Sequence, residues 1–331
     1  MQTLFDDKAK NRSIIGSGLG IVFSNKRYII WFWVLNLALA GMGASAFRES
    51  AHSILDHSLY SSRLIHGFDL SVMFELFARP EFGSTPEVVR PAVSLAIVFF
   101  FLTALFLPGI FAGYASTYRL PREDFFRACG RNLWRFIRLM IIAGIVMAIV
   151  AGLLFAANGA IVKKAGENTN EVLPFTLQMI GMFVIFLVMT SLRIWFDLAE
   201  ADIVLNDQRA VRKSIAAGFR HTFRSLGRLL SSYVLATIFA AIFLVGGLWC
   251  WIHLVPSESI VRAFLLSQLI LFLLLIPRFW QRGMAVSYWE QRMLIPVVAV
   301  TETIPPEPVP VGAVPEPAPI IPATTLPDQG S

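Results

Sequence analysis

Three charged residues, Arg193, Asp197 and Glu200, have the types and spacing that could do chemistry in this chain. On an α-helix, at about 100° per residue, they fall within an arc of about 60°. They end a long apolar stretch, so this charge cluster would lie at the edge of a membrane segment, where it could bind an ion or a polar substrate. The alternative is an ion-pair network that fixes the following turn against neighbouring arginines. We favour the ion-pair network.

No other part of the sequence has a pattern typical of catalysis or metal binding. The chain lacks a Walker motif, a GxSxG elbow, an HExxH pair and the Cys/His spacing of zinc sites. His52, His57 and His66 share one stretch with acidic residues, but His52 and His57 are five positions apart and do not share a helical face. We therefore expect no catalytic residues, no metal site and no cofactor, and predict that the protein is not an enzyme.

The charge cluster leads into a turn at Asn206-Asp207 and then into a basic amphipathic helix. One arc of this helix is apolar and aromatic: Val211, Ile215, Phe219, Thr222, Phe223 and Leu226. Another arc is cationic: Arg209, Lys213, Arg220 and Arg224, with Arg212 at its edge. Such a helix lies in a membrane interface with its cations near anionic headgroups, and Asn206 or Asp207 is expected to cap it. A solvated helix of a soluble domain is the alternative, which the flanking apolar stretches disfavour.

A second basic segment, residues 115–138, alternates arginines with aromatic residues. Its arginines are Arg119, Arg122, Arg127, Arg131, Arg135 and Arg138. This pattern could also stack on nucleic-acid bases, but beside an apolar span it favours anchoring at the membrane interface. We predict that Arg131 and Arg135 contact anionic lipid headgroups, and that the chain binds no nucleic acid.

The elements that must position these residues are membrane helices. The chain of 331 residues is 56% hydrophobic and only 15% charged, whereas soluble domains carry about 25% charged residues. We predict an all-α, polytopic membrane bundle of six transmembrane helices. Its spans are residues 28–47, 91–114, 139–158, 173–196, 229–251 and 259–277, with the last one closing at Pro277. The basic and aromatic residues after Pro277 are predicted to lie at the interface.

Two domains follow from the composition along the chain. Residues 1–295 form the transmembrane domain, and residues 296–331, with PPEPVP and PEPAP, form a disordered Pro-rich tail that could bind a protein partner. Ala44-Ser45-Ala46 resembles a signal-peptidase site, but we expect the first span to be retained because the polar region before it is long.

The distribution of lysines and arginines predicts the orientation. Of the 28 cations, 20 fall on the side of the N-terminus and 7 on the opposite side, with Arg193 inside a span. Because cytoplasmic loops are enriched in lysine and arginine, we predict that both termini are cytoplasmic and that the protein lies in a bacterial inner membrane.

Each odd-numbered span is preceded by a basic segment, which suggests an internal repeat. Aligning residues 12–28 with 213–229 pairs Ser13 with Ser214 and Ile14 with Ile215. Three units of an interfacial helix plus a helical hairpin would give this pattern, and so would a similar composition alone.

Three segments carry a resemblance to a known family: DFFRACGRNLWRFIRL, DLAEADIVLNDQRAVRKSIAAGFRHTFRS and AVSYWEQR. Residues 12–295 resemble bacterial six-span membrane proteins similar to the membrane domain attached to some glycerophosphodiester phosphodiesterases. The resemblance implies a fold. It does not imply phosphodiester hydrolysis, because the sequence contains no counterpart of their catalytic barrel.

The function predicted from these features is that of a non-enzymatic membrane protein. It would organise or assist other membrane components, with anionic lipids as its partners through the basic interfacial helices. The alternative is a small transporter or a lipid-handling permease, which should bring polar groups together at mid-bilayer. Gln268 is the polar residue at that depth, and we expect it to form a hydrogen bond between helices.

Overall fold

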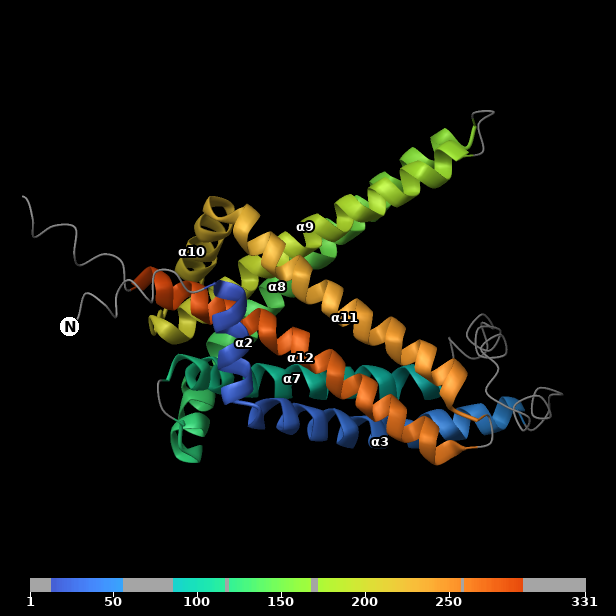
Figure 1. Ribbon diagram of the computed structural model, residues 1–331, viewed down its shortest axis with the longest axis horizontal. Coiled ribbons are helices and arrows are strands. Elements are labelled where there is room, and N and C mark those ends of the chain that lie inside the picture. The colour runs from blue at the N-terminus through green and yellow to red at the C-terminus, as the bar shows by residue number, and fades with distance from the viewer. Residues whose placement is uncertain (1–12, 56–85, 117–118, 168–171, 257–258, 294–331) are drawn as a thin grey trace, which may run out of the picture. The chain divides into compact units, whose positions relative to one another are not determined.

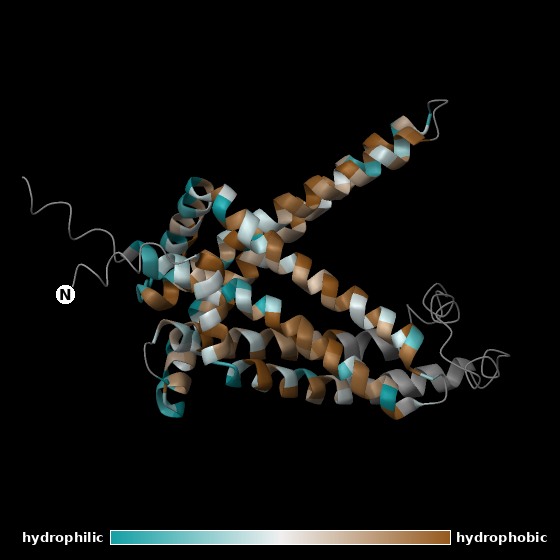
Figure 2. Ribbon diagram, in the orientation of Figure 1, coloured by the Kyte–Doolittle hydropathy of each residue, from teal (hydrophilic) through white to brown (hydrophobic). Residues whose placement is uncertain are grey.

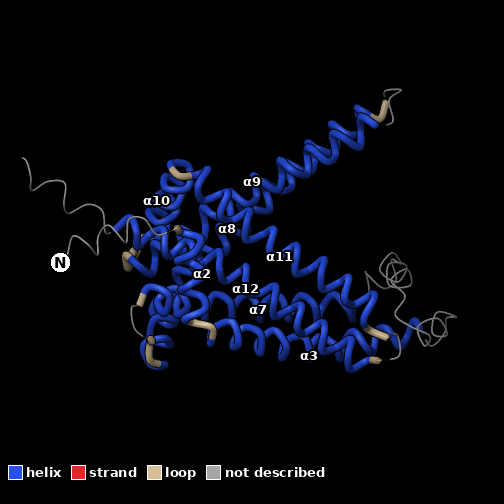
Figure 3. The backbone as a smooth tube through the Cα atoms, viewed as in Figure 1, coloured by secondary structure: helices blue, strands red, loops and turns tan. Residues whose placement is uncertain are grey.

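The structure is a computed structural model that describes residues 13–55, 86–116, 119–167, 172–256 and 259–293. Every regular element among these residues is an α-helix (Figures 1 and 3), which confirms the predicted all-α class. The helices are α2 (Ile14–Ser24), α3 (Arg27–Leu55), α7 (Pro86–Ala115), α8 (Arg122–Ala165), α9 (Val172–Leu205), α10 (Val211–Arg224), α11 (Leu226–Leu254) and α12 (Ile260–Met293). The predicted tail, residues 296–331, lies outside the described residues.

Five of these helices are long and apolar enough to cross a membrane, which indicates a polytopic membrane protein. They are α8, α9 and α11 over their whole length, Val93–Ala115 of α7 and Val261–Arg292 of α12. The predicted first span begins α3, whose apolar part within the residues searched, Arg27–Gly43, is shorter than the other five. The described residues therefore contain five candidate spans, and the predicted sixth is not confirmed.

Two predicted boundaries differ from the structure because helices continue across them. The basic segment before the third span is not a separate element, since α8 runs without a break over 44 residues. The sixth span does not close at Pro277, since α12 continues through this proline to Met293. A proline removes one backbone hydrogen bond, and in membrane helices neighbouring groups compensate for that loss.

The buried core extends over the start of α3, the C-terminal part of α7, the first half of α8, and the region where the C-terminal ends of α9 and α12 meet α2, α10 and the start of α11. This last region is called here the junction. Residues 279–289 of α12 are all buried, including Phe279, Trp280 and Met284. This basic and aromatic stretch is therefore packed inside the protein, against α2, α9 and α11. Its position at a membrane interface stays a prediction.

Away from the junction, the apolar side chains of the long helices are exposed in the protein alone. Leu153 of α8 and Phe183 of α9 keep 67% and 62% of their surface. Figure 2 shows hydrophobic residues along α8, α9 and α12, and hydrophilic residues on α10. Exposed apolar surface of this extent is typical of helices that face lipid.

The short helices α2 and α10 bury residues at the same spacing, one residue away from the predicted register, whereas the repeat of three units stays a prediction. The buried residues are Ile14, Gly18 and Val22 in α2, and Ser214, Gly218 and Thr222 in α10. These sets have residue numbers that differ by 200 (214 against 14), whereas the predicted alignment paired Ile14 with Ile215. The C-caps Asn25 and Ser225 keep the same offset and similar angles, φ −114° and ψ 32° against φ −127° and ψ 27°.

Each of these two helices is held by a tryptophan from a neighbouring long helix. The Trp195 Nε1 of α9 donates to the carbonyl oxygen of Ile215 at 2.7 Å. The Trp280 Nε1 of α12 donates to the carbonyl oxygen of Ile15 at 2.9 Å. The ends of α9 and α12 therefore play equivalent roles, and the sequence shows it as Arg-x-Trp at both Arg193 and Arg278.

The first turns of α8 pack in a related way on α7. A Cβ atom on Gly109 would lie 2.5 Å from the Cys129 sulfur, and one on Gly113 would overlap the Tyr28 ring. The GxxxG pair of α7 thus allows two neighbours to approach closely, as its spacing predicts. Each amphipathic segment packs on a long helix: α8 on α7, α10 on α9, and α2 on α12.

Candidate functional site

The predicted amphipathic helix is α10, and it packs against α9 through small residues. Its buried side consists of Ser214, Gly218 and Thr222. A Cβ atom on Gly218 would lie 2.7 Å from the carbonyl oxygen of Trp195, so this close approach of the two backbones requires glycine. The predicted helical wheel contained only an apolar arc and a cationic arc. Small residues spaced by four were the signal for this third face.

The other two faces of α10 are only partly covered: Val211 and Ile215 pack against the core, whereas the phenylalanine rings and the cations are exposed. Phe219 and Phe223 keep 46% and 56% of their surface, and their ring centroids are 4.4 Å apart. All four predicted headgroup contacts on this helix and its approach are exposed, and none forms a salt bridge to a described residue: Arg209, Lys213, Arg220 and Arg224. Aromatic rings and cations on one free surface are what an interfacial helix requires.

The two headgroup contacts predicted on α8, Arg131 and Arg135, have a protein partner in the turn before α10. Arg135 donates from Nη1 to the Asp207 Oδ1 at 2.8 Å, and Arg131 Nη2 lies 3.5 Å from the same oxygen. The hydrogen bond from Arg135, with both positive charges, holds the pKa of Asp207 below its usual value. The Arg135 side chain is 19% exposed and that of Arg131 is 59% exposed, so Arg131 is the better placed for a headgroup.

The prediction that Asn206 or Asp207 caps α10 is wrong. The N-cap is Ala210, which makes no side-chain cap. Asn206 instead donates to the Asp202 carboxylate at 2.6 Å, and Asp207 adopts a left-handed backbone with φ 45° while it pairs with Arg135. The turn is therefore fixed by contacts to α8 and α9, and the chain needs several more residues before α10 begins.

The charge cluster lies at the junction, where α12 adds two more arginines. Asp197 and Glu200 are 7% and 9% exposed, and Arg193 Nε lies 3.9 Å from the Asp197 Oδ2. Arg278 and Arg282 lie on α12, which packs against α9. Among the described residues the cluster forms one salt bridge, Arg193–Asp197, while the Glu200 Oε2 and the Arg282 Nε are buried without a hydrogen-bond partner. The ion-pair network therefore stays a prediction.

Residues from two other helices join Asp197 in a hydrogen-bond network. The Tyr233 hydroxyl of α11 lies 3.0 Å from the Asp197 Oδ2 and 3.0 Å from the carbonyl oxygen of Gln281, so its one proton serves two acceptors. Gln281 Nε2 donates to the Thr237 hydroxyl at 3.2 Å. The network therefore joins α9, α11 and α12. Tyr233 and Gln281 are far from Asp197 in the sequence, and no local pattern identified them.

A second polar contact joins α10 to α12 through His221. Arg292 hydrogen-bonds the Nδ1 of this histidine, and the Trp289 ring lies edge-on to it at 4.7 Å. Burial, followed by the positive charge of Arg292, lowers the pKa of His221. One turn along, the hydroxyls of Ser225 and Tyr288 are 3.0 Å apart. These contacts hold the C-terminal end of α10 against the junction.

The three histidines considered for a metal site, His52, His57 and His66, lie mostly outside the described residues. His57 and His66 lie outside the described residues, and only the backbone of His52, in α3, is described. Among the side chains that the structure describes, no group of three His, Cys, Asp or Glu residues could hold a metal ion.

Comparison with protein-family models, with curated proteins and with solved structures found no match for this chain. The function is therefore argued from two features of the geometry. One is the exposed aromatic and cationic surface of α10, and the other is the network that fixes α9, α11 and α12 beneath it.

Proposed function

We propose that the protein is a non-enzymatic, six-span membrane protein that organises or assists other membrane components by binding anionic lipid headgroups through α10. In this proposal α3 supplies the sixth span and the membrane is a bacterial inner membrane. The junction and both termini face the cytoplasm, because 20 of the 28 cations fall on that side. The resemblance to six-span proteins similar to the membrane domain of glycerophosphodiester phosphodiesterases remains part of the proposal.

The proposal rests on one observation: α10 packs on α9 through one face and presents different side chains on its other two faces. Its small face, centred on Gly218, is occupied by α9. The Phe223 ring and the four cations are exposed, and the Phe219 ring is 46% exposed although it contacts Trp195 edge-on. Two interactions hold a helix in a membrane interface. Aromatic rings insert at the boundary between headgroups and acyl chains, and cations contact the headgroups. A protein partner that binds the Pro-rich tail would then be recruited to the same membrane surface.

The test is to compare lipids retained by the full-length protein after extraction in a mild detergent. Replacing Arg209, Lys213, Arg220 and Arg224 together by glutamine should lower the ratio of retained anionic to neutral lipid several-fold, since each cation contributes on the order of 1 kcal/mol at most. The matched control replaces Lys163 and Lys164, at the C-terminal end of α8, by glutamine. Unchanged retention in the four-residue variant would show that these cations bind something other than headgroups.

The small transporter or lipid-handling permease is the second candidate, and one observation favours it. Two polar atoms within the long helices, the Thr103 Oγ1 of α7 and the Gln268 Oε1 of α12, are buried without a hydrogen-bond partner among the described residues. The hydrogen bond between helices that was predicted for Gln268 is thus not made by this oxygen. Affinity capture in mild detergent separates the two functions: an organiser retains protein partners, whereas a permease retains the molecule it carries.

A further inference from the structure

A groove of about 570 Å³ lies between α3, α7 and the first turns of α8. Its walls are almost entirely apolar, with aromatic rings on all three helices, among them Phe32, Phe106, Phe125 and Phe126. Its lining residues on α3 run from Tyr28 to Ala38. At about 1.5 Å per residue this is roughly 15 Å, or half of a hydrocarbon core of about 30 Å. The groove therefore has the length that one leaflet gives to an acyl chain.

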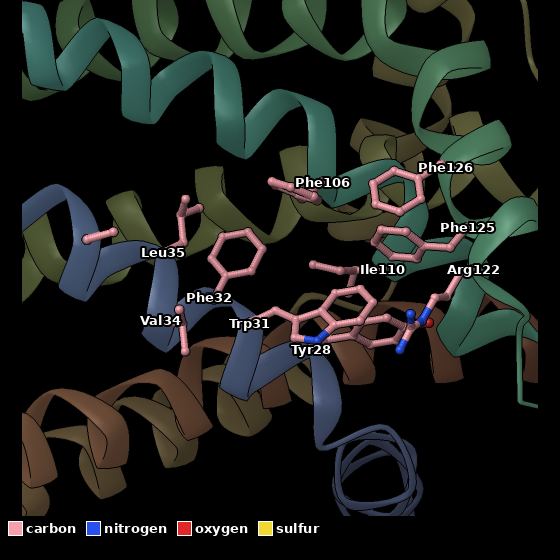
Figure 4. A pocket seen from close by; sticks show the side chains of 11 residues that line it. Tyr28, Trp31, Phe32, Val34, Leu35, Phe106, Ile110, Arg122, Phe125 and Phe126 are labelled. Atoms are coloured by element: carbon pink, nitrogen blue, oxygen red, sulfur yellow. The ribbon is translucent and has the colours of Figure 1, made fainter.

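One end of the groove is positively charged. Among the described residues that line it, Arg122 alone carries a charge. Figure 4 shows Arg122 beside Tyr28 and Phe125, with Val34 and Leu35 at the opposite end. Arg122 is the first residue of α8, is exposed, and forms no salt bridge to a described residue. A guanidinium group at the mouth of an apolar groove complements a phosphate that is joined to an acyl chain.

The charged end is held in shape by contacts that need no ligand. The Tyr28 ring stacks on the Phe125 ring with centroids 5.3 Å apart. Arg27 donates to the Tyr28 hydroxyl and to the carbonyl oxygen of Leu120, each at 2.8 Å. Gly113 leaves the space that the Tyr28 ring occupies. Because these walls are fixed in advance, little ordering is required when a ligand enters.

We propose that this groove is a binding site for one anionic phospholipid, with an acyl chain among the aromatic rings and the phosphate at Arg122. The site is distinct from the surface of α10, because its residues come from α3, α7 and α8. It goes beyond general contact with headgroups, since it selects a single lipid by its chain and its charge together.

The experiment is native mass spectrometry of the full-length protein titrated with phosphatidylglycerol, or with phosphatidylcholine of the same acyl chains. One phosphatidylglycerol should bind more tightly than any further lipid, and about fivefold more tightly than phosphatidylcholine. Arg122→Gln should remove this preference. Arg127→Gln is the matched control, because Arg127 lies on the same helix and pairs with Asp124 outside the groove.

Blocking the groove tests the position of the chain. Ala38→Trp fills the end away from Arg122 and should abolish tight binding of the first lipid of either class. Ala40→Trp, also exposed on α3 but outside the groove lining, should bind as the unchanged protein does. If Ala38→Trp does not fold, Val34→Trp blocks the groove from a side chain that is 51% exposed, with Ile30→Trp, 45% exposed, as its control.

The proposal is overturned if the first lipid binds no more tightly than later ones, or if the folded blocking variants bind it as tightly as their controls do. The lipid site in the groove and the function proposed for α10 can be tested independently of each other. The variant with four glutamines on and before α10 should keep the tightly bound lipid, whereas the groove variants should keep the general retention of anionic lipid.

Discussion

Asp197 is contacted by one helix besides its own and is linked through that contact to a second. The Tyr233 hydroxyl of α11 lies 3.0 Å from its carboxylate, the backbone of α12 shares that hydroxyl, and Arg193 approaches at 3.9 Å. Burying a carboxylate costs free energy. Removing its partner costs more, because the buried charge is then neither solvated nor paired. The contribution of each neighbour of Asp197 to the free energy of unfolding is therefore best measured by replacing that neighbour.

Arg193→Gln should lower the free energy of unfolding, because it leaves Asp197 without its nearest cation on α9. Removing one partner of a fully buried pair costs about 3–5 kcal/mol. We expect about 1–2 kcal/mol here, because the Arg193 side chain is 37% exposed and the Tyr233 hydroxyl still contacts Asp197. Thermal unfolding of the purified protein measures this.

The matched control for Arg193→Gln is Arg127→Gln, which breaks an exposed pair of 2.9 Å with Asp124 on α8. Its effect should stay within about 0.5 kcal/mol. The ratio of anionic to neutral retained lipid should be unchanged in both variants. Equal stability of Arg193→Gln and the parent protein would mean that the cluster does not depend on this pair.

His221 should make the stability of the protein depend on pH as the pH falls below about 6.5. Burial and then Arg292 lower the pKa of His221 in the folded protein, with Arg220 and Arg224 adding to the effect and Asp202 opposing it. The stability linked to this histidine is then complete above the unfolded value of 6.5 and is lost as the pH falls towards the lower folded value. The loss should stay below about 1 kcal/mol, since the ring is only partly buried.

Melting temperatures measured across this pH range provide the check. His221→Gln should flatten the dependence, because glutamine does not titrate. His253→Gln alters an exposed histidine at the C-terminal end of α11 and should leave the slope as it is. A slope that survives in His221→Gln would assign the pH dependence to another group.

At the scale of helices, α2 and α10 are attached by the same device. Each places one glycine against the backbone of a long helix and accepts a tryptophan hydrogen bond on a carbonyl group one turn away. The small glycine face sets the distance between the helices, and the indole fixes the position along the axis. Attached in this way, α10 keeps Phe223 and its cations exposed.

Gly218→Ala should destabilise the attachment of α10 to α9. The added Cβ would lie 2.7 Å from a carbonyl oxygen of α9, and overpacking of this kind costs about 1–3 kcal/mol. Gly18→Ala should behave alike, because its Cβ would lie 2.8 Å from the Met284 backbone nitrogen. Gly227→Ala, in the first turn of α11, meets nothing within 4 Å and should be neutral or stabilising by up to about 1 kcal/mol.

Thermal unfolding and limited proteolysis at the start of α10 distinguish these three variants. Faster cleavage near Ala210 is expected for Gly218→Ala, and neither of the other two should show it. If Gly218→Ala matches Gly227→Ala in both measurements, the close approach of α10 to α9 is not what holds this helix.

At the scale of the whole molecule, the testable feature is the side of the membrane on which each connection lies. A reporter fused at Gly166, at the end of α8, should be periplasmic, and one at Asn206, after α9, should be cytoplasmic. The reason is the excess of cations on the side of the N-terminus. Alkaline phosphatase and green fluorescent protein fusions report the two compartments, and reversed signals would reject the orientation.

Much of the architecture could be predicted from the sequence because the physical signals are local. Apolar runs long enough to cross a bilayer predicted five helices that the structure also shows, and the turn at Asn206-Asp207 separates α9 from α10. The exposed cations of α10 also followed from residue spacing alone. In each case the deciding property belongs to one short segment, namely its hydropathy or its helical period.

Only the tertiary structure decided which residues meet. The buried path of α12 beyond Pro277, the contact of Tyr233 with Asp197 and the pairing of Arg135 with Asp207 join residues that are distant in the chain. A basic and aromatic stretch has the same local pattern whether lipid headgroups or other helices surround it. The sequence therefore determined the helices and their amphipathic faces, whereas packing determined which face each neighbour covers, because burial depends on what lies opposite.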